Sequence, residues 1–297
     1  MNLQGSVSLK DVVALFQLER SGEDCFHGPS LDLKWGYLFG GQIAAQALAA
    51  AERTVEADQT AHSLHGYFLR PGDERIPVSY VLRRVRDGKS FATRHVDAIQ
   101  GGHAIFTLIA SFQREESGFE HQADMPQTPG PEGLMSQGEI ARACGERMPD
   151  SAREQLSLEG AIEIRPVHVA DPITSPTTSP MRRVWYRATE RLPDSPALHR
   201  HLLTYVSDLN LLSTAMDPHA LSWLQPDVQA ASLDHAIWFH RPFRMDEWLL
   251  YVNDSPSAQG ARGYARGQFF TQDGRLVAST AQEGLIRLTK KDAGTPQ

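Results

Sequence analysis

One plan of elements occurs twice in this chain, first in residues 61–113 and again in residues 232–283. Each copy contains an Arg-Pro pair, at Arg70-Pro71 and at Arg241-Pro242, and the two pairs lie 171 residues apart. A Gly-containing turn and then an apolar run follow each pair at almost the same distance, as expected for strands joined by a hairpin. A repeat with a period well beyond about 50 residues is not a solenoid. It predicts a duplicated domain, in effect a homodimer fused into one chain.

Each copy is expected to hold one long apolar helix and four strands. The helices are expected at residues 40–54, which are rich in alanine, and at residues 196–216, where apolar residues recur on one face. The strands are expected at 62–69, 76–86, 90–100 and 103–113, and at 233–240, 247–252, 262–271 and 276–288. Short loops with Pro, Gly and Asp turn signals predict a meander in each copy. Because every strand offers an apolar face that needs cover, each sheet must wrap its helix, which predicts an α+β fold.

Shorter elements are expected outside the repeats: a helix capped by Ser8, a strand around 25–27, and strands at 161–169 and 183–189 joined by a loop at 171–180. From residue 114 to about 158 the sequence is rich in Pro, Gly, Glu and Ser, with one short helix expected near 139–144. These features predict a first domain at 1–121, a linker at 122–158 and a second domain at 159–297.

Charge and composition exclude several classes of function. The net charge of -7 argues against a nucleic-acid partner, because phosphate binding needs a surplus of Lys and Arg on one face. The two cysteines, Cys25 and Cys144, lie far apart, which favours free thiols in a reducing compartment. No apolar run is long enough to span a bilayer and the first residues carry no signal-peptide pattern, so we expect a cytoplasmic protein without a membrane partner.

Three segments of the second copy resemble signature segments of the acyl-CoA thioesterase II family. They are Tyr205 to Asn210, Ser232 to Arg241 and Ala278 to Gly284. The first copy agrees with the family at Gly40-Gly41-Gln42, at His62 to Asp73 and at Gly118 to Gln122. The resemblance covers most of the chain in the expected order and is weakest in the linker. We regard it as specific, because several unrelated segments would otherwise have to agree by accident.

The resemblance implies a double hotdog fold, in which two helix-wrapped antiparallel sheets in tandem form one pseudo-dimeric unit. It also implies hydrolysis of a fatty acyl-CoA thioester to free acid and coenzyme A, without a metal or cofactor. The family's catalytic trio falls on Asp208, Ser232 and Gln282. Besides the acyl-CoA substrate, the expected partner is a further copy of the chain, because hotdog sheets commonly pair edge to edge into a dimer or tetramer.

The three residue types suit this chemistry. A thioester carbonyl is electrophilic and a thiolate is a good leaving group, so a held and deprotonated water can attack without a covalent intermediate. Asp208 would act as general base or water orienter, and Ser232 offers a hydroxyl that both donates and accepts. The Gln282 amide would fix the water or the carboxylate, and its strand parity with small residues predicts that it points inward.

The first copy lacks these groups. Its helical segment from Trp35 to Ala51 contains no Asp or Glu, and the counterparts of Ser232 and Gln282 are expected to be Ala61 and Ala110. One acid-bearing site per chain is therefore expected, with the first half as wall and binding surface. The helix start at Gly40 and Gly41 is a candidate oxyanion hole, because its free N–H groups and positive end favour negative charge. His65 is a further candidate for the pocket wall.

Other interpretations stay open at this point. An Asp on a helix is usually a solvated charge, Ser232 can simply begin a strand, and Gln282 can be an ordinary sheet residue. The twelve histidines form no HExxH or other tight ligand cluster, so no metal site is expected. A hotdog hydratase or dehydratase would need a catalytic His with a nearby acid, and only His65 is attractive for that role. A non-catalytic acyl-CoA-binding module is the remaining alternative.

Overall fold

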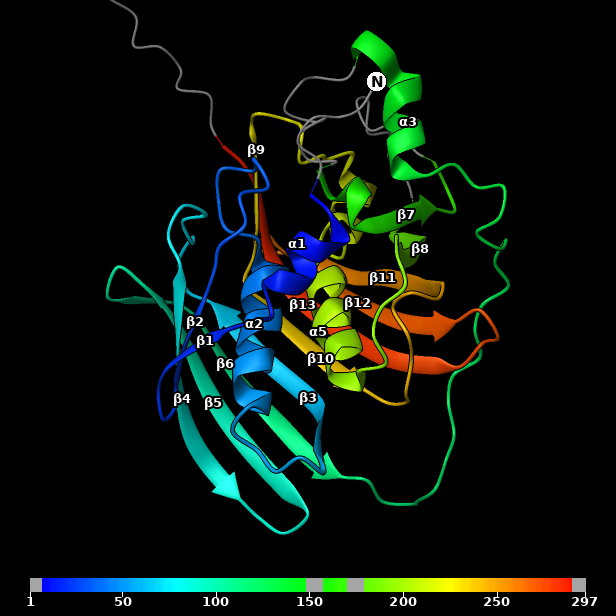
Figure 1. Ribbon diagram of the computed structural model, residues 1–297. Helices are drawn as coiled ribbons and strands as arrows, with labels where there is room; N and C mark the ends of the chain where they lie inside the picture. The colour runs from blue at the N-terminus through cyan, green and yellow to red at the C-terminus, as the bar shows by residue number, and fades with distance from the viewer. Residues whose placement is uncertain (1–6, 148–156, 170–178, 290–297) are drawn as a thin grey trace, which may run out of the picture.

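The computed structural model describes residues 7–147, 157–169 and 179–289. At its centre two helices, α2 (Gly40–Glu52) and α5 (Pro196–Ser207), lie side by side, and one large curved antiparallel sheet wraps around both (Figure 1). This is the double hotdog arrangement that the sequence predicts. Each apolar helix is covered by the concave face of its own half of the sheet, which is where most of the buried core lies.

The first half begins with α1 (Leu9–Ala14), which Ser8 caps as expected. Its strands are β1 (Glu19–Gly22), β2 (Cys25–Gly28), β3 (Gln59–Phe68), β4 (Val78–Asp87), β5 (Phe91–Gln100) and β6 (His103–Arg114). The second half contains β7 (Ile162–Pro166), β8 (Met181–Ala188), β9 (Val228–Ser232), β10 (Asp234–Phe239), β11 (Leu249–Gln259), β12 (Arg262–Thr271) and β13 (Leu276–Leu288). Strands β1 and β9 were not expected from the sequence. Residues 171–178 of the expected loop lie outside the described residues.

The strand order corrects the expected meanders. The sheet runs β1-β2-β4-β5-β6-β3-β10-β13-β12-β11-β8-β7, with β9 paired to β13. In each half three strands form a meander, but the strand before them, β3 or β10, lies beside the last strand and not beside the first. The connection from β3 to β4 spans residues 69–77, which is longer than the roughly two to five residues of a hairpin and contains Pro71. It therefore crosses to the other edge of the meander.

The two halves meet at β3 and β10. His65 lies opposite Ala236 in this antiparallel pair, and these are also equivalent positions of the 171-residue repeat. The duplicated units are thus related about this point as the subunits of a twofold dimer would be. The helices approach closely beside it, since a Cβ on Gly41 would come within 2.3 Å of the Tyr205 carbonyl oxygen. Only glycine fits there.

A buried charged cluster ties the two helices together. The Glu52 carboxylate at the end of α2 accepts a hydrogen bond from Arg200 Nε at 3.1 Å and lies 2.7 Å from His201 Nε2, both on α5. Burial raises the pKa of Glu52, but the hydrogen bond from His201 and the charges of His201 and Arg200 lower it more. The net pKa of this carboxyl therefore falls below its ordinary value.

Glu52→Gln is expected to lower the free energy of unfolding by about 3 kcal/mol near neutral pH, because the Arg200 guanidinium and the His201 ring lose their carboxylate partner in a largely buried place. A lowered folded-state pKa stabilises the protein above the unfolded pKa of about 4.3, and this contribution is lost as the pH falls through the folded pKa. Urea unfolding should therefore show a gap between parent and variant that closes at acid pH. The exposed residue Glu56, changed to Gln, is the control. Equal stability of Glu52→Gln and parent at neutral pH would contradict this role.

The segment between the halves packs against the outside of the second sheet, where Figure 1 shows it running past the ends of β11 to β13. Trp185 Nε1 donates to the Pro129 carbonyl at 2.9 Å, and Gln122 Nε2 donates to the Gly274 carbonyl at 2.8 Å. Met125 and Leu134 pack on an apolar cluster that contains Trp185. The short helix expected here is present as α3 (Gln137–Cys144). In the described part of the chain, no helix is long and apolar enough to cross a membrane.

Candidate active site

Asp208 lies where helix α5 stops. The sequence predicts one helix over residues 196–216, but α5 ends at Ser207 with Asp208 as its C-cap, and a separate short helix, α6 (Ser213–Met216), follows. Between them Asn210 adopts a left-handed conformation with φ of 63°, which an α-helix cannot continue through. The expected single helix is therefore wrong, and the break brings the Asp208 side chain to the end of the helix bundle.

Two tyrosines stabilise this break. The last carbonyl groups of a helix have no partner within the helix and need other donors. Tyr251 Oη donates to the Ser207 carbonyl at 3.0 Å, and Tyr186 Oη donates to the Leu209 carbonyl at 3.4 Å. Tyr186 also accepts from Asn210 Nδ2 at 3.1 Å, and burial raises its pKa to about 12. Phenol groups from two strands thus hold the backbone on both sides of Asp208.

The three residues predicted as catalytic contact one another. Gln282 Nε2 donates to Asp208 Oδ1 at 2.8 Å and also to Ser232 Oγ, while Ser232 Oγ donates to the same Asp208 oxygen at 3.2 Å. Asp208 comes from the end of α5, Ser232 from the last position of β9, and Gln282 from the middle of β13. Gln282 is 1% exposed, so its side chain points inward as strand parity predicts. Asp208 and Ser232 are partly exposed to a cavity.

Helix α2 of the first half begins directly opposite Asp208. A Cβ placed on Gly40 would come within 2.7 Å of Asp208 Oδ2 and 2.8 Å of a Phe68 ring carbon. The Gln282 and Ser232 hydrogen bonds both reach Oδ1, and among the described residues no hydrogen bond is made to Oδ2. One carboxylate oxygen is therefore anchored, and the other faces the start of α2.

A cavity of about 770 Å³ opens in front of this carboxylate. Its walls come from both halves and from the segment between them. The first half contributes aromatic side chains and Gly40, the second contributes Asp208 and Ser232, and α3 contributes residues from its first turns. Apolar side chains that line it include Trp35, Phe39, Ile43, Phe68, Leu212 and Trp223. Such a site suits an apolar chain ending in a polar reacting group.

His65 lies away from this site. Its side chain is exposed on the outer face of the sheet, where it makes an edge-to-face contact with Trp238, and it does not line the cavity. The reason is strand parity, because the neighbouring residues Leu64 and Gly66 point toward the core. We therefore do not include His65 among the site residues, and it offers no acid–base pair for hydration.

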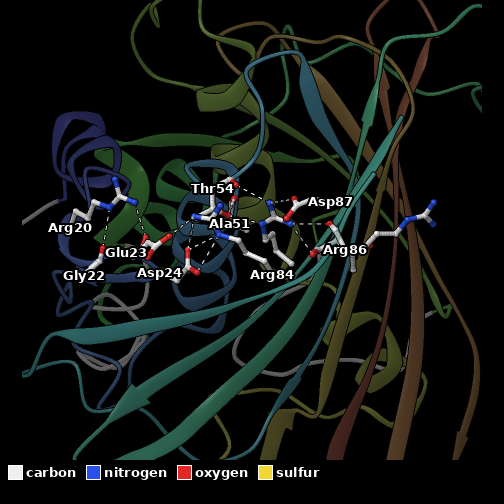
Figure 2. A network of polar contacts seen from close by, with 11 residues as sticks. Arg20, Gly22, Glu23, Asp24, Ala51, Thr54, Arg84, Arg86 and Asp87 are labelled. Carbon is white, nitrogen blue, oxygen red and sulfur yellow. Dashed lines mark hydrogen bonds and ion pairs between the residues drawn. The ribbon is translucent and has the colours of Figure 1, made fainter. Parts of the chain in front are cut away.

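A buried arginine, Arg94, occupies the corresponding region of the first half. On β13 Gln282 lies opposite Ala265, and at the equivalent place on β6 Ala110 lies opposite Arg94. Arg94 is 1% exposed and donates to Thr54 Oγ1 at 2.9 Å, and it is paired with Asp87. Figure 2 shows the surrounding polar network, with Thr54, Arg86 and Asp87 near one another. The large polar side chain thus lies on β5 in the first half and on β13 in the second, with an alanine opposite it each time. Among the described residues, the first half has the hydrogen-bonded Arg94 guanidinium at this place and no Ser–Gln–Asp cluster.

Several contributors to the site were missed from sequence alone. The strand β9, which carries Ser232, follows an irregular stretch and carries no clear alternating pattern. The break after Asp208 had a usable signal, because Asp and Asn two residues apart favour helix ends over helix interiors. The tyrosine contacts with the break come from residues far away in sequence, and nothing local predicts them.

The chain is similar to known proteins over most of its length. A family model described as the acyl-CoA thioesterase N-terminal domain matches residues 31–113, and one described as acyl-CoA thioesterase matches residues 152–285. The chain is 37% identical to acyl-CoA thioesterase 2 of Haemophilus influenzae, over 95% of this chain and 99% of the relative. It is 39% identical to human acyl-coenzyme A thioesterase 8, over 93% of this chain and 89% of the relative. The crystal structure of an acyl-CoA thioesterase II, TesB2, from Mycobacterium marinum matches with a TM-score of 0.77 and 40% identity, over 94% and 99% of the two chains.

Proposed function

Because the chain belongs to the acyl-CoA thioesterase family and is a thioester hydrolase, we propose that it cleaves acyl-CoA with a water molecule activated by Asp208, Ser232 and Gln282. The observation that carries this assignment is the mutual hydrogen bonding of the three side chains, two of which, Asp208 and Ser232, line one cavity. No covalent intermediate is required, since the thioester is reactive enough for direct attack by an oriented water.

In this mechanism Asp208 Oδ2 takes a proton from the water as the water oxygen attacks the thioester carbonyl carbon. The other oxygen, Oδ1, is held by Gln282 and Ser232, so the carboxylate cannot rotate away. A tetrahedral intermediate forms and carries negative charge on the former carbonyl oxygen. The C–S bond then breaks, the electron pair leaves on sulfur, and the proton on Asp208 returns to the thiolate. Free acid and coenzyme A result.

The start of α2 is suited to stabilise the negative charge of that intermediate. The first N–H groups of a helix have no partner within it, and the helix dipole adds partial positive charge there. Gly40 lies against the carboxylate, and no hydrogen bond from the N–H of Gly40 or Gly41 to another described group is present. We include these two N–H groups as the oxyanion hole, which makes the first half part of the catalytic site.

Incubation with a panel of acyl-CoA thioesters should release free thiol, followed with a thiol reagent, in step with free acid. Hydration or simple binding releases none, so absence of thiol from every substrate that binds would favour those alternatives. The mechanism also predicts that mass spectrometry under turnover finds no acyl adduct on Ser232. An adduct there that forms and decays at the rate of turnover would contradict direct attack by water.

Gly40→Ala is expected to lower kcat by roughly tenfold or more while leaving the fold intact. The new methyl group would lie 2.7 Å from Asp208 Oδ2, so the carboxylate or the helix must shift, and small misplacements at a reacting centre are costly. Alanine is otherwise favourable in a helix. Gly118→Ala is the matched control, because nothing lies within 4 Å of a Cβ at that exposed position. A kcat for Gly40→Ala equal to that of Gly118→Ala would show that the close approach is unimportant.

A further inference from the structure

His235 is a buried histidine that the mechanism above does not use. It lies on β10 and is 1% exposed. The antiparallel register pairs Ala236 with Ala281 on β13, and the next position along places His235 opposite Gln282. Residues opposite each other on neighbouring strands have their Cβ atoms only about 5 Å apart on the same face of the sheet. The two side chains therefore meet inside the core, behind the catalytic cluster.

Two buried polar atoms at this place have no hydrogen-bond partner in standard geometry among the described residues. They are Nδ1 of His235 and Oε1 of Gln282. A buried carbonyl without a donor destabilises the folded protein, and a ring N–H is the donor that it needs. The other ends of both side chains are fixed, because Gln282 Nε2 donates to Asp208 and His235 Nε2 lies 2.8 Å from Ser207 Oγ.

We propose that His235 is a positioning residue for hydrolysis, whose Nδ1–H holds the Gln282 amide oxygen so that the amide nitrogen faces Asp208 and Ser232. The proposal rests on the proposed function of those three residues. The proposal fixes the tautomer of His235, with the ring proton on Nδ1. Ser207 Oγ lies 2.8 Å from both the Thr204 carbonyl oxygen and His235 Nε2, and the proposal assigns its single proton to Nε2. The opposite tautomer would set an unprotonated Nδ1 against the amide oxygen, which is repulsive. Burial lowers the pKa of His235, which favours the neutral ring that this arrangement needs.

The duplicated half gives an independent indication. The repeat offset places Leu64 at the position of His235, and Leu64 lies opposite Ala110, the counterpart of Gln282. The half without the catalytic cluster thus has two apolar residues where the other half has a polar pair. If the histidine only filled the core, the half without the glutamine would not need a different residue at the histidine position.

Three substitutions of His235 separate positioning from packing. Asparagine places its side-chain N–H close to the position of Nδ1. Glutamine places its amide close to the position of Nε2 instead. Leucine has no polar group and is the residue found at the equivalent position, Leu64. We expect His235→Leu and His235→Gln to lower kcat roughly tenfold with KM changed less than about threefold, and His235→Asn to keep most of the kcat. The matched control is His199→Leu, because His199 is equally buried on α5, about 13 Å along the helix from Asp208, and should leave kcat unchanged.

The same substitutions in a Gln282→Ala background complete the test. If His235 acts only through Gln282, His235→Gln should cause no further loss of kcat there, which is the signature of coupled residues. A loss of equal size in both backgrounds, or equal loss for Asn, Gln and Leu, would mean that His235 only packs the core and would overturn the proposal. An unchanged kcat in all three variants would overturn it too. If Gln282→Ala itself leaves kcat intact, the proposed catalytic cluster fails first, so the two failures are distinguishable.

Discussion

Asp208→Asn is expected to lower kcat for acyl-CoA hydrolysis by roughly 100- to 10,000-fold, the range in which a positioned general base contributes. The amide has nearly the same shape and can still accept a hydrogen bond through its oxygen, so the fold and substrate binding should survive. It cannot take the proton of the attacking water. Steady-state thiol release gives kcat and KM, and thermal unfolding of the variant checks that the structure is intact.

Asp234→Asn is the matched control for this substitution. Asp234 is a partly buried carboxylate two residues beyond Ser232, and its Oδ1 accepts a hydrogen bond from the Glu283 N–H, which an amide oxygen can also do. It does not line the cavity. A turnover for Asp208→Asn within about threefold of the parent, a barrier change below ~1 kcal/mol, would remove Asp208 from the mechanism. A similar large loss in both variants would point to a general electrostatic or folding effect.

The repeat made the fold predictable from sequence. Two apolar helices and two sets of strands bounded by turn residues leave few ways to bury every apolar face. Helix α2 and the start of α5 lie where they are expected, and each expected long strand overlaps an observed one, although α5 ends at Ser207 and not at 216. The order of the strands was not predictable in the same way. A turn signal such as Pro71-Gly72 shows that a strand ends, but whether the next strand pairs with it depends on where the connection crosses, which is a tertiary property.

The sequence predicts which residues make up the proposed site, but it does not predict how they are arranged. The resemblance to a thioesterase family pointed to Asp208, Ser232 and Gln282, and strand parity alone indicated that Gln282 faces inward. The sequence placed Asp208 within a continuous helix, where a side chain beside Val206 and Leu209 would face other core residues. The helix break places it at a cavity instead, and the break depends on Tyr186 and Tyr251 from strands that fold against it. Local sequence carries no record of those contacts.

The proposed mechanism explains why the two halves of a duplicated fold would need only one hydrogen-bonded cluster. The hydrogen-bonded cluster needs the end of one helix, two strands of its own sheet and the start of the other helix, because Gly40 of α2 approaches Asp208 of α5. In the proposed mechanism the first half therefore takes part in catalysis without a polar cluster of its own. Its Arg94 occupies the equivalent interior with every contact made inside that half.

Ser232→Ala is expected to lower kcat roughly 10- to 100-fold, corresponding to about 1 to 3 kcal/mol for a lost hydrogen-bond partner in an otherwise assembled site. The hydroxyl accepts from Gln282 and donates to Asp208, so its removal leaves both with one contact fewer. Ser232→Thr keeps the oxygen, and a β-branched residue suits the end of a strand. It should therefore stay within a few-fold of the parent, as measured by thiol release under saturating substrate.

This pair of variants decides between orientation and nucleophilic attack. A serine that attacks the thioester itself would lose turnover completely as alanine, and as threonine it would be crippled by the added methyl group beside the reacting oxygen. A serine that only orients water and carboxylate keeps partial activity without its hydroxyl, because Gln282 still anchors Asp208 Oδ1 at 2.8 Å. Near-total loss in both variants, with normal thermal unfolding, would therefore be incompatible with direct attack by water. A graded loss, small for threonine and intermediate for alanine, is what the contacts of Ser232 predict.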